Sequence, residues 1–190
     1  MMRPSMITLG SVALLTALNA GAFQATQATD EKSVLIVVAQ ALCSMNKSSH
    51  VLLDSRGAYA SPTLEAKFKQ IGLDQEFAKL LLDENRGGII PRGEPYGCLQ
   101  VTDGSKIEDA FGPQGEASKE GQRWAAFHKV FPGVDGYAAF SMPAFSVSGD
   151  SAVVYSFYSC GLSCGKGRVY ILKRTDRSWT LSKELPLWDF

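Results

Sequence analysis

The chain has 190 residues, and its 19 basic side chains are balanced by 19 acidic ones. This balance excludes the broad positive surface that binds nucleic acid and the broad negative surface that binds cationic partners. A chain of this length buries about two thirds of its unfolded surface in one core. We therefore expect a single folded domain whose core needs neither a metal ion nor a disulfide for its stability, and we predict no cofactor.

The first 22 residues have the pattern of a secretory signal peptide. Arg3 supplies the positive start, an apolar run of 12 residues extends from Ile7 to Leu18, and Ala20-Gly21-Ala22 is a small-residue cleavage site. The run is too short to span a membrane, and an uncleaved anchor is the alternative interpretation. Because the first cysteine is Cys43, no lipid attachment is indicated at the cleavage site. We predict a secreted or periplasmic domain of residues 23–190 with no stable membrane anchor after cleavage.

The first elements of this domain are a helix and a short strand. Residues 29–45 carry apolar side chains three and four positions apart, which predicts a helix with Asp30 as its N-cap. The apolar run from His50 to Asp54 follows, and we expect it to form an edge strand of the sheet.

Two consecutive amphipathic helices are predicted next. The first begins at Ser61-Pro62 and ends at Gly72, and the second begins at Asp74 and ends at Gly87-Gly88. Their inward positions are Leu64, Phe68 and Ile71 in the first helix and Phe77, Leu80 and Leu81 in the second.

The segment 87–121 is different in character. It holds eight glycines and three prolines, and its one convincing strand is residues 98–101. We predict mostly loop here, since glycine and proline interrupt regular structure. Trp124, Phe127, His128 and Phe131 then recur at helical spacing, which predicts a short helix with an aromatic face before Pro132-Gly133 ends it.

The stretch 137–185 has the pattern of an antiparallel meander, because short β-branched and aromatic runs alternate with Gly, Asp and Ser turns. Two runs are apolar on both faces, with Val153, Tyr155 and Phe157 opposed by Val154 and Tyr158, and Val169 and Ile171 opposed by Tyr170 and Leu172. They are predicted to be central strands. In the last run, Trp179 and Leu181 are predicted to point inward.

These elements predict an α+β fold. Three or four helices should pack on one face of an antiparallel sheet, and helices must also cover the apolar second side of its central strands. An NTF2-like or cystatin-like sheet wrapped on a helix is the specific form that analogy suggests.

A C-terminal block of motifs resembles a family of uncharacterised secreted bacterial proteins. The block is written Arg123-Trp-x-x-Phe-x-x-x-Phe-Pro-Gly133, then Cys160-Gly-Leu-x-Cys-Gly-x-Gly167, then Trp179. The resemblance is strongest over 123–188, is weaker over 77–85, and departs from the family pattern in 87–121. It implies secretion and a layout of helices plus a meander, and it implies no activity, cofactor or catalytic residue.

Four cysteines in an oxidising compartment predict two disulfides. Cys160 and Cys164 flank a Gly-Leu-Ser loop, and a three-residue hairpin loop would place them opposite each other at a distance a disulfide tolerates. Cys43 and Cys98 are then paired by elimination. A metal site and a redox pair are the alternatives for Cys160 and Cys164, although their spacing is not C-x-x-C.

Several catalytic motifs match only in part. Gly161-Leu-Ser163-Cys-Gly165 has the letters of a nucleophile elbow, but a strand follows it and both histidines precede it. The segment 112–119 has the composition of a phosphate-binding loop without the Gly-Lys-Ser/Thr order. The acidic neighbours Asp83/Glu84 and Glu108/Asp109 are interpreted as solvated faces.

Trp124 and His128 are the candidate ligand-binding residues, because they share one helix face beside the sheet. Without a catalytic constellation we expect a non-catalytic binding or interaction module, whose partner is a small molecule or a protein. Two enzyme functions are kept as alternatives. One is a hydrolase that uses His128 with a carboxylate from 87–121, and the other is a thiol-redox role for Cys160 and Cys164.

Overall fold

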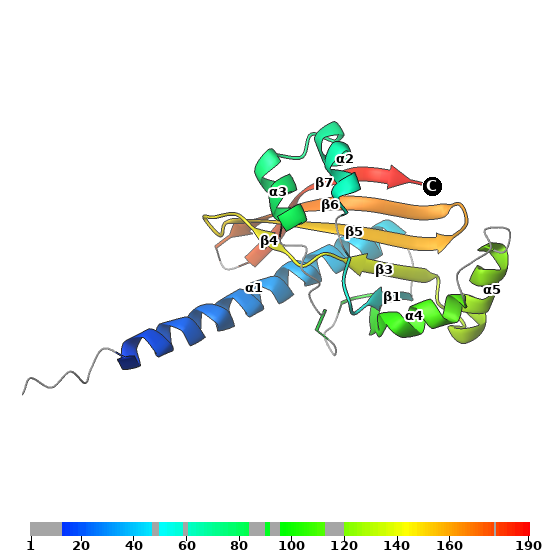
Figure 1. Ribbon diagram of the computed structural model, residues 1–190, viewed down its shortest axis with the longest axis horizontal. Coiled ribbons are helices and arrows are strands. Elements are labelled where there is room, and N and C mark those ends of the chain that lie inside the picture. The colour runs from blue at the N-terminus through cyan, green and yellow to red at the C-terminus, as the bar shows by residue number, and fades with distance from the viewer. Residues whose placement is uncertain are drawn as a thin grey trace, which may run out of the picture.

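The computed structural model describes residues 13–46, 50–58, 61–83, 90–91, 96–112, 120–176 and 178–190. Within these residues the chain forms a seven-stranded mixed sheet and five α-helices (Figure 1). The sheet has the order β2-β1-β3-β5-β6-β7, and the short β4 pairs with β5. The predicted α+β class is confirmed.

The C-terminal meander is present as predicted. Its strands are β3 (Gly136–Phe140), β4 (Ala144–Phe145), β5 (Ser151–Gly161), β6 (Cys164–Thr175) and β7 (Ser178–Asp189). They pair antiparallel, and β5 and β6 are central. The predicted faces are also correct, since Val153 and Tyr155 pack in one core cluster and Val154 and Tyr158 in another.

Two parallel strands extend the sheet beyond the meander. They are β1 (Val51–Asp54) and β2 (Leu99–Thr102). β1 lies between β2 and β3 and is parallel to both. The prediction that residues 50–54 form an edge strand is therefore wrong. The physical reason is that Leu52 and Leu53 are apolar on opposite faces of the sheet, and an interior strand buries both side chains. The sheet is mixed, and the antiparallel prediction holds only for the meander.

One long helix, α1 (Ala13–Asn46), packs on one face of the sheet. It contributes Val34, Leu35, Val38 and Leu42 to the core, which confirms the apolar face predicted for 29–45. The helix begins well before Asp30, so Asp30 is not its N-cap. Instead, Asp30 accepts a hydrogen bond from Trp179 Nε1 and forms an ion pair with Arg174 of β6.

The N-terminal half of α1 extends past the sheet (Figure 1). The predicted cleavage site at Ala22 falls within this half, and cleavage there stays a prediction. None of the helices in the described residues combines the length and apolar character that a membrane crossing requires.

Two helix pairs cover parts of the opposite face. The first is α2 (Glu65–Gln70), preceded by a 3₁₀ turn (Pro62–Leu64), with α3 (Gln75–Asp83), and the second is α4 (Gly104–Phe111) with α5 (Glu120–Val130). Phe68 and Leu81 pack against β4, β5 and β6, whereas Phe127 and Ile107 pack against Leu52 of β1. Helices therefore cover both faces, so the expected cover of the second side is present, whereas the packing of three or four helices together on one face is not.

The ends of the first pair follow their predicted signals. The Ser61 side chain accepts a hydrogen bond from Thr63 N–H, and Asp74 accepts one from Glu76 N–H at 2.8 Å. Gly72 has a φ of 69°, the left-handed conformation that suits glycine after a helix. The predicted stop at Gly87-Gly88 lies outside the described residues.

The prediction of loop for 87–121 is wrong over α4. Asp103 caps this helix by accepting a hydrogen bond from Ser105 N–H at 3.0 Å. The helix opens with Gly104 and has only Ile107 and Ala110 as fully buried apolar side chains, so its periodicity is weak in the sequence. The strand predicted at 98–101 is present as β2.

Two details of the meander differ from the prediction. Trp179 is buried as expected, but Leu181 is 39% exposed, because β7 is an edge strand and its register shifts beside Leu181. The loop between β5 and β6 has two residues, Leu162 and Ser163, and not three, since Gly161 pairs directly with Cys164.

Candidate functional site

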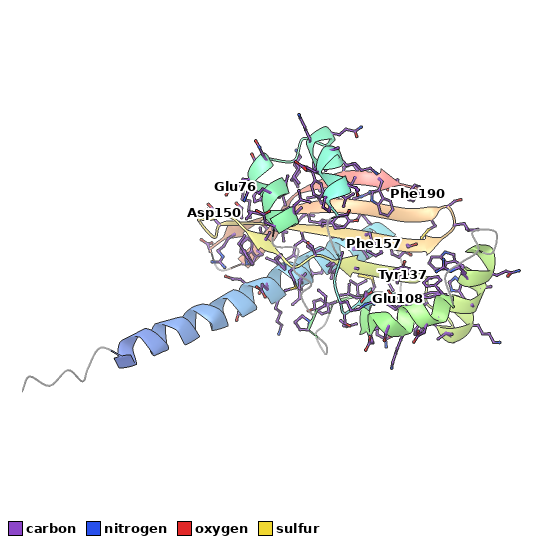
Figure 2. The ribbon with its side chains drawn as sticks, viewed as in Figure 1. Glu76, Glu108, Tyr137, Asp150, Phe157 and Phe190 are labelled. Atoms are coloured by element: carbon purple, nitrogen blue, oxygen red, sulfur yellow. A yellow bond between two sulfur atoms is a disulfide. The ribbon has the colours of Figure 1, made fainter. Side chains whose placement is uncertain are left out.

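A groove of about 560 Å³ lies where α4 and α5 meet the sheet. The sheet contributes Tyr137 from β3 and Phe157 from β5, and α4 and α5 contribute further side chains (Figure 2). Its full described lining is Asp54, Arg56, Ile107, Glu108, Asp109, Phe111, Gly112, Arg123, Tyr137 and Phe157.

The floor of the groove is aromatic. Tyr137 makes edge contacts with Phe157 at a ring-centroid distance of 5.8 Å and with Phe111 at 5.6 Å. Tyr137 and Phe157 lie on the sheet face that carries both helix pairs, and each is only partly buried. The two helix pairs thus leave aromatic surface accessible between them. Flat apolar ligand groups favour such surfaces.

A charged rim borders this floor where β1 ends. Arg56 donates hydrogen bonds to both carboxylate oxygens of Asp54, at 3.2 and 2.9 Å, and its Nη1 lies 3.0 Å from Glu108 Oε2. The hydrogen bond to Asp54 is the main cause that raises the pKa of Arg56, and the bond to Glu108 adds to it. Arg56 is therefore a cation whose charge is already matched by two carboxylates.

Gly104 lets this rim form. A methyl group on its Cα would collide with Arg56 Nε and with Asp54 Oδ1. The first turn of α4 can approach the ion pair only because this residue has no side chain.

A second arginine, Arg123 on α5, lines the same groove, but its donors are used differently from those of Arg56. Its guanidinium lies 5.6 Å from the centre of the Phe111 ring. Its Nε is buried and has no hydrogen-bond partner among the described residues. Burial raises the pKa of the Tyr137 hydroxyl, the charge of Asp54 acts in the same direction, and the charge of Arg123 opposes it. The charges of Asp54 and Arg123 therefore both act on the Tyr137 hydroxyl.

The residues predicted for ligand binding, Trp124 and His128, are not in the described lining of this groove. Trp124 packs edge-on against Phe111 at 5.1 Å and lies 6.2 Å from Tyr137, so it supports two lining residues without itself appearing in the lining. His128 is exposed, and its described contacts are with the rings of Trp124 and Phe127. A direct role for Trp124 and His128 in binding stays a prediction.

Both predicted disulfides are confirmed. Cys43 is joined to Cys98 with a Cα distance of 5.7 Å, and Cys160 is joined to Cys164 with a Cα distance of 5.1 Å. The first ties α1 to the start of β2, and the second closes the β5–β6 hairpin. Among the described residues, no cluster of three or more His, Cys, Asp or Glu side chains could hold a metal ion.

Sequence reasoning missed the groove residues. Glu108 and Asp109 are exposed as expected, but the sequence did not indicate that Glu108 pairs with Arg56 or that both residues line the groove. The charges of Asp54 and Arg56, placed directly after an apolar strand, were a usable signal, because polar groups at the carboxyl end of a parallel strand often form sites. Arg123 carried no such signal, since it differs from any surface arginine only through its packing.

A larger hollow of about 640 Å³ lies between α2 and α3. Its lining is mostly exposed and includes Thr63, Glu65, Lys69 and Gln75. Since its described lining has no aromatic floor and no buried polar group, it lacks the convergent chemistry of a binding site. The smaller groove is the better candidate.

Searches against protein-family models, curated proteins and solved structures find no match to this chain. The resemblance to secreted bacterial proteins and the NTF2-like or cystatin-like analogy therefore stay predictions.

Proposed function

We propose that this protein is a non-catalytic binding module, secreted or periplasmic, whose ligand lies in the groove between α4, α5 and the sheet. The single observation that carries the proposal is the accessible aromatic floor of Tyr137 and Phe157 beside a pre-formed ion-pair rim. The ligand presents an apolar or aromatic group to this floor.

The arrangement suits binding better than catalysis. Arg56 is neutralised by Asp54 and Glu108, so the most prominent charges of the rim are already committed to each other. Catalysis needs a nucleophile or proton-transfer group that faces the ligand with a partner that activates it. The contacts of the described residues add no support to the hydrolase or thiol-redox alternatives.

The test uses the purified exported protein and a panel of small aromatic fragments, observed by ligand-detected NMR. We expect a subset to bind, and Phe157→Ala to weaken that subset about tenfold, the loss that follows when an aromatic contact and its apolar area are removed. Lys69→Ala, in the hollow between α2 and α3, is the matched control and should change nothing.

Circular dichroism of each variant establishes that it is folded. If fragments bind equally well to Phe157→Ala and to the wild type, or if none binds at millimolar concentration, the proposed groove is wrong.

The localisation has its own test. Export should remove residues 1–22, because Arg3, the apolar run and the Ala20-Gly21-Ala22 site form one processing signal. Intact-mass measurement of the exported protein should give a chain that begins at Phe23. A mass that includes Met1 would contradict the signal peptide.

A further inference from the structure

The two groove arginines, Arg56 and Arg123, differ in whether their donors already have acceptors. From this difference we infer that the ligand carries an anionic oxygen group, a carboxylate or a phosphate, that binds Arg123. The aromatic part of the ligand lies on Tyr137 and Phe157. The inference rests on the proposed function and specifies the chemical class of the ligand.

Arg56 and Arg123 differ in how their donors are used. The Arg56 guanidinium donates to Asp54 and also pairs with Glu108. The Arg123 guanidinium faces the Phe111 ring, and its buried Nε has no acceptor in the described part of the chain. A guanidinium stays charged at any physiological pH and has five donors that need acceptors. Arg123 is therefore the groove cation that an incoming acceptor can satisfy.

The chemistry of arginine strengthens the argument. A buried donor without an acceptor is costly, and the Arg123 Nε is such a donor among the described residues. The Nη groups of the same guanidinium present a fork of donors that matches carboxylates and phosphates. A ligand oxyanion bound to these groups would give the Arg123 charge a partner.

Two acidic residues of the rim are paired with Arg56 and not with Arg123. Asp54 and Glu108 lie 2.9 and 3.0 Å from Arg56 nitrogens and share its single positive charge, so this cluster of one cation and two carboxylates has a net charge of −1. Asp109 is exposed, and solvent and salt screen its charge. The net negative cluster around Arg56 and the separate cation Arg123 would therefore orient an amphipathic anion with its charged group toward Arg123.

The experiment compares three probes with one aromatic part, 2-naphthoate, 2-naphthyl phosphate and the neutral 2-naphthamide, by fluorescence titration. For the wild type we expect at least one anion to bind about tenfold more tightly than the amide, since a hydrogen bond to a charged group is worth roughly that factor. The two anionic arms distinguish a carboxylate ligand from a phosphate ligand.

Arg123→Met should abolish the preference for the anion and leave the affinity for naphthamide unchanged. Arg123→Lys should retain part of the preference and shows whether charge alone suffices. Lys129→Met removes an exposed charge from the same helix and should change neither affinity. If Arg123→Met does not fold, the Lys variant and the salt dependence of naphthoate binding to the wild type still test the inference.

The outcomes separate the two proposals. Equal binding of all three probes to the wild type, weakened by Phe157→Ala, overturns the anion inference and keeps the groove. Anion binding that Arg123→Met leaves untouched overturns the assignment to Arg123. If that variant does not fold, naphthoate binding to the wild type that salt does not weaken overturns it. Failure of every probe to bind overturns the groove itself.

Discussion

The two faces of the sheet are covered in different ways. On one face a single helix, α1, packs against a continuous core, and its position is secured by the Cys43–Cys98 disulfide and by the contacts of Asp30 with Arg174 and Trp179. On the other face two helix pairs form two separate core clusters. The continuous face is built for stability, and the divided face leaves Tyr137 and Phe157 accessible between its clusters.

The difference shows how one sheet can serve two purposes. Apolar strands need cover on both sides, and one long helix provides this most completely. Two short helix pairs cover the second side but leave a seam, the gap between the pairs where Tyr137 and Phe157 are accessible. Side chains along this seam can contact a ligand without any opening of the core. Changes to the α1 face should therefore affect stability, whereas changes at the seam should affect binding.

The largest expected effect is on the α1 face. Trp179→Ala should lower the free energy of unfolding by about 3–5 kcal/mol, the usual cost of deleting a large buried aromatic. Trp179 packs on Phe145, under Arg174 and against Asp30. Chemical denaturation measures the loss. Leu181→Ala on the same strand is the control and should cost less than about 1 kcal/mol, because Leu181 is 39% exposed whereas Trp179 is 6% exposed. Similar values for both would contradict the burial assigned to Trp179.

The disulfides should differ by their loop lengths. Replacement of Cys43 and Cys98 by Ser should cost about 4 kcal/mol, since the cross-link spans 55 residues, and replacement of Cys160 and Cys164 should cost about 2 kcal/mol, since that pair spans 4. Unfolding curves of the two double variants give the comparison. A larger loss for the hairpin pair would show that loop entropy does not govern their contributions.

Gly104→Ala tests the approach of α4 to the rim. Its new methyl group should displace Arg56 and Asp54 and cost about 1–3 kcal/mol, as overpacking does. Gly121→Ala in α5 is a matched control because, among the described residues, its methyl group would meet only Leu162, at 3.8 Å. The control should be neutral or stabilising by up to about 1 kcal/mol. A tolerated Gly104→Ala would show that the ion pair can move freely.

The smallest effect is expected at the rim itself. Glu108→Gln should change the free energy of unfolding by less than about 1 kcal/mol, because the pair with Arg56 is exposed and screened. Denaturation at low and high salt measures this change. A loss of several kcal/mol would mean that the seam is as important for stability as the α1 face.

Periodicity and turn chemistry predicted the meander correctly. The alternation in Val153, Val154 and Tyr155 assigned the faces of β5, because side-chain direction in a strand follows from position alone. The start of the 3₁₀ turn and α2 at Ser61, and the position of Asp74 before α3, followed from the same kind of local signal. The pairing of Cys160 with Cys164 needed only the hairpin between them.

Other features depended on contacts between distant residues. The central place of β1 requires β2 and β3, which lie far along the chain, to pair on either side of it. Helix α4 is stabilised by tertiary contacts of Ile107 and Ala110 more than by its own propensity.

The sequence by itself determined the α+β class, the faces of the central strands and the two disulfides, because each depends on local period, turn geometry or cysteine count. Tertiary structure alone decided that β1 lies inside a mixed sheet, that helices cover both faces, and that Asp54, Arg56, Glu108 and Arg123 meet around Tyr137. The physical reason is that a groove is a gap between packed elements, and its lining is set by distances that no single segment contains.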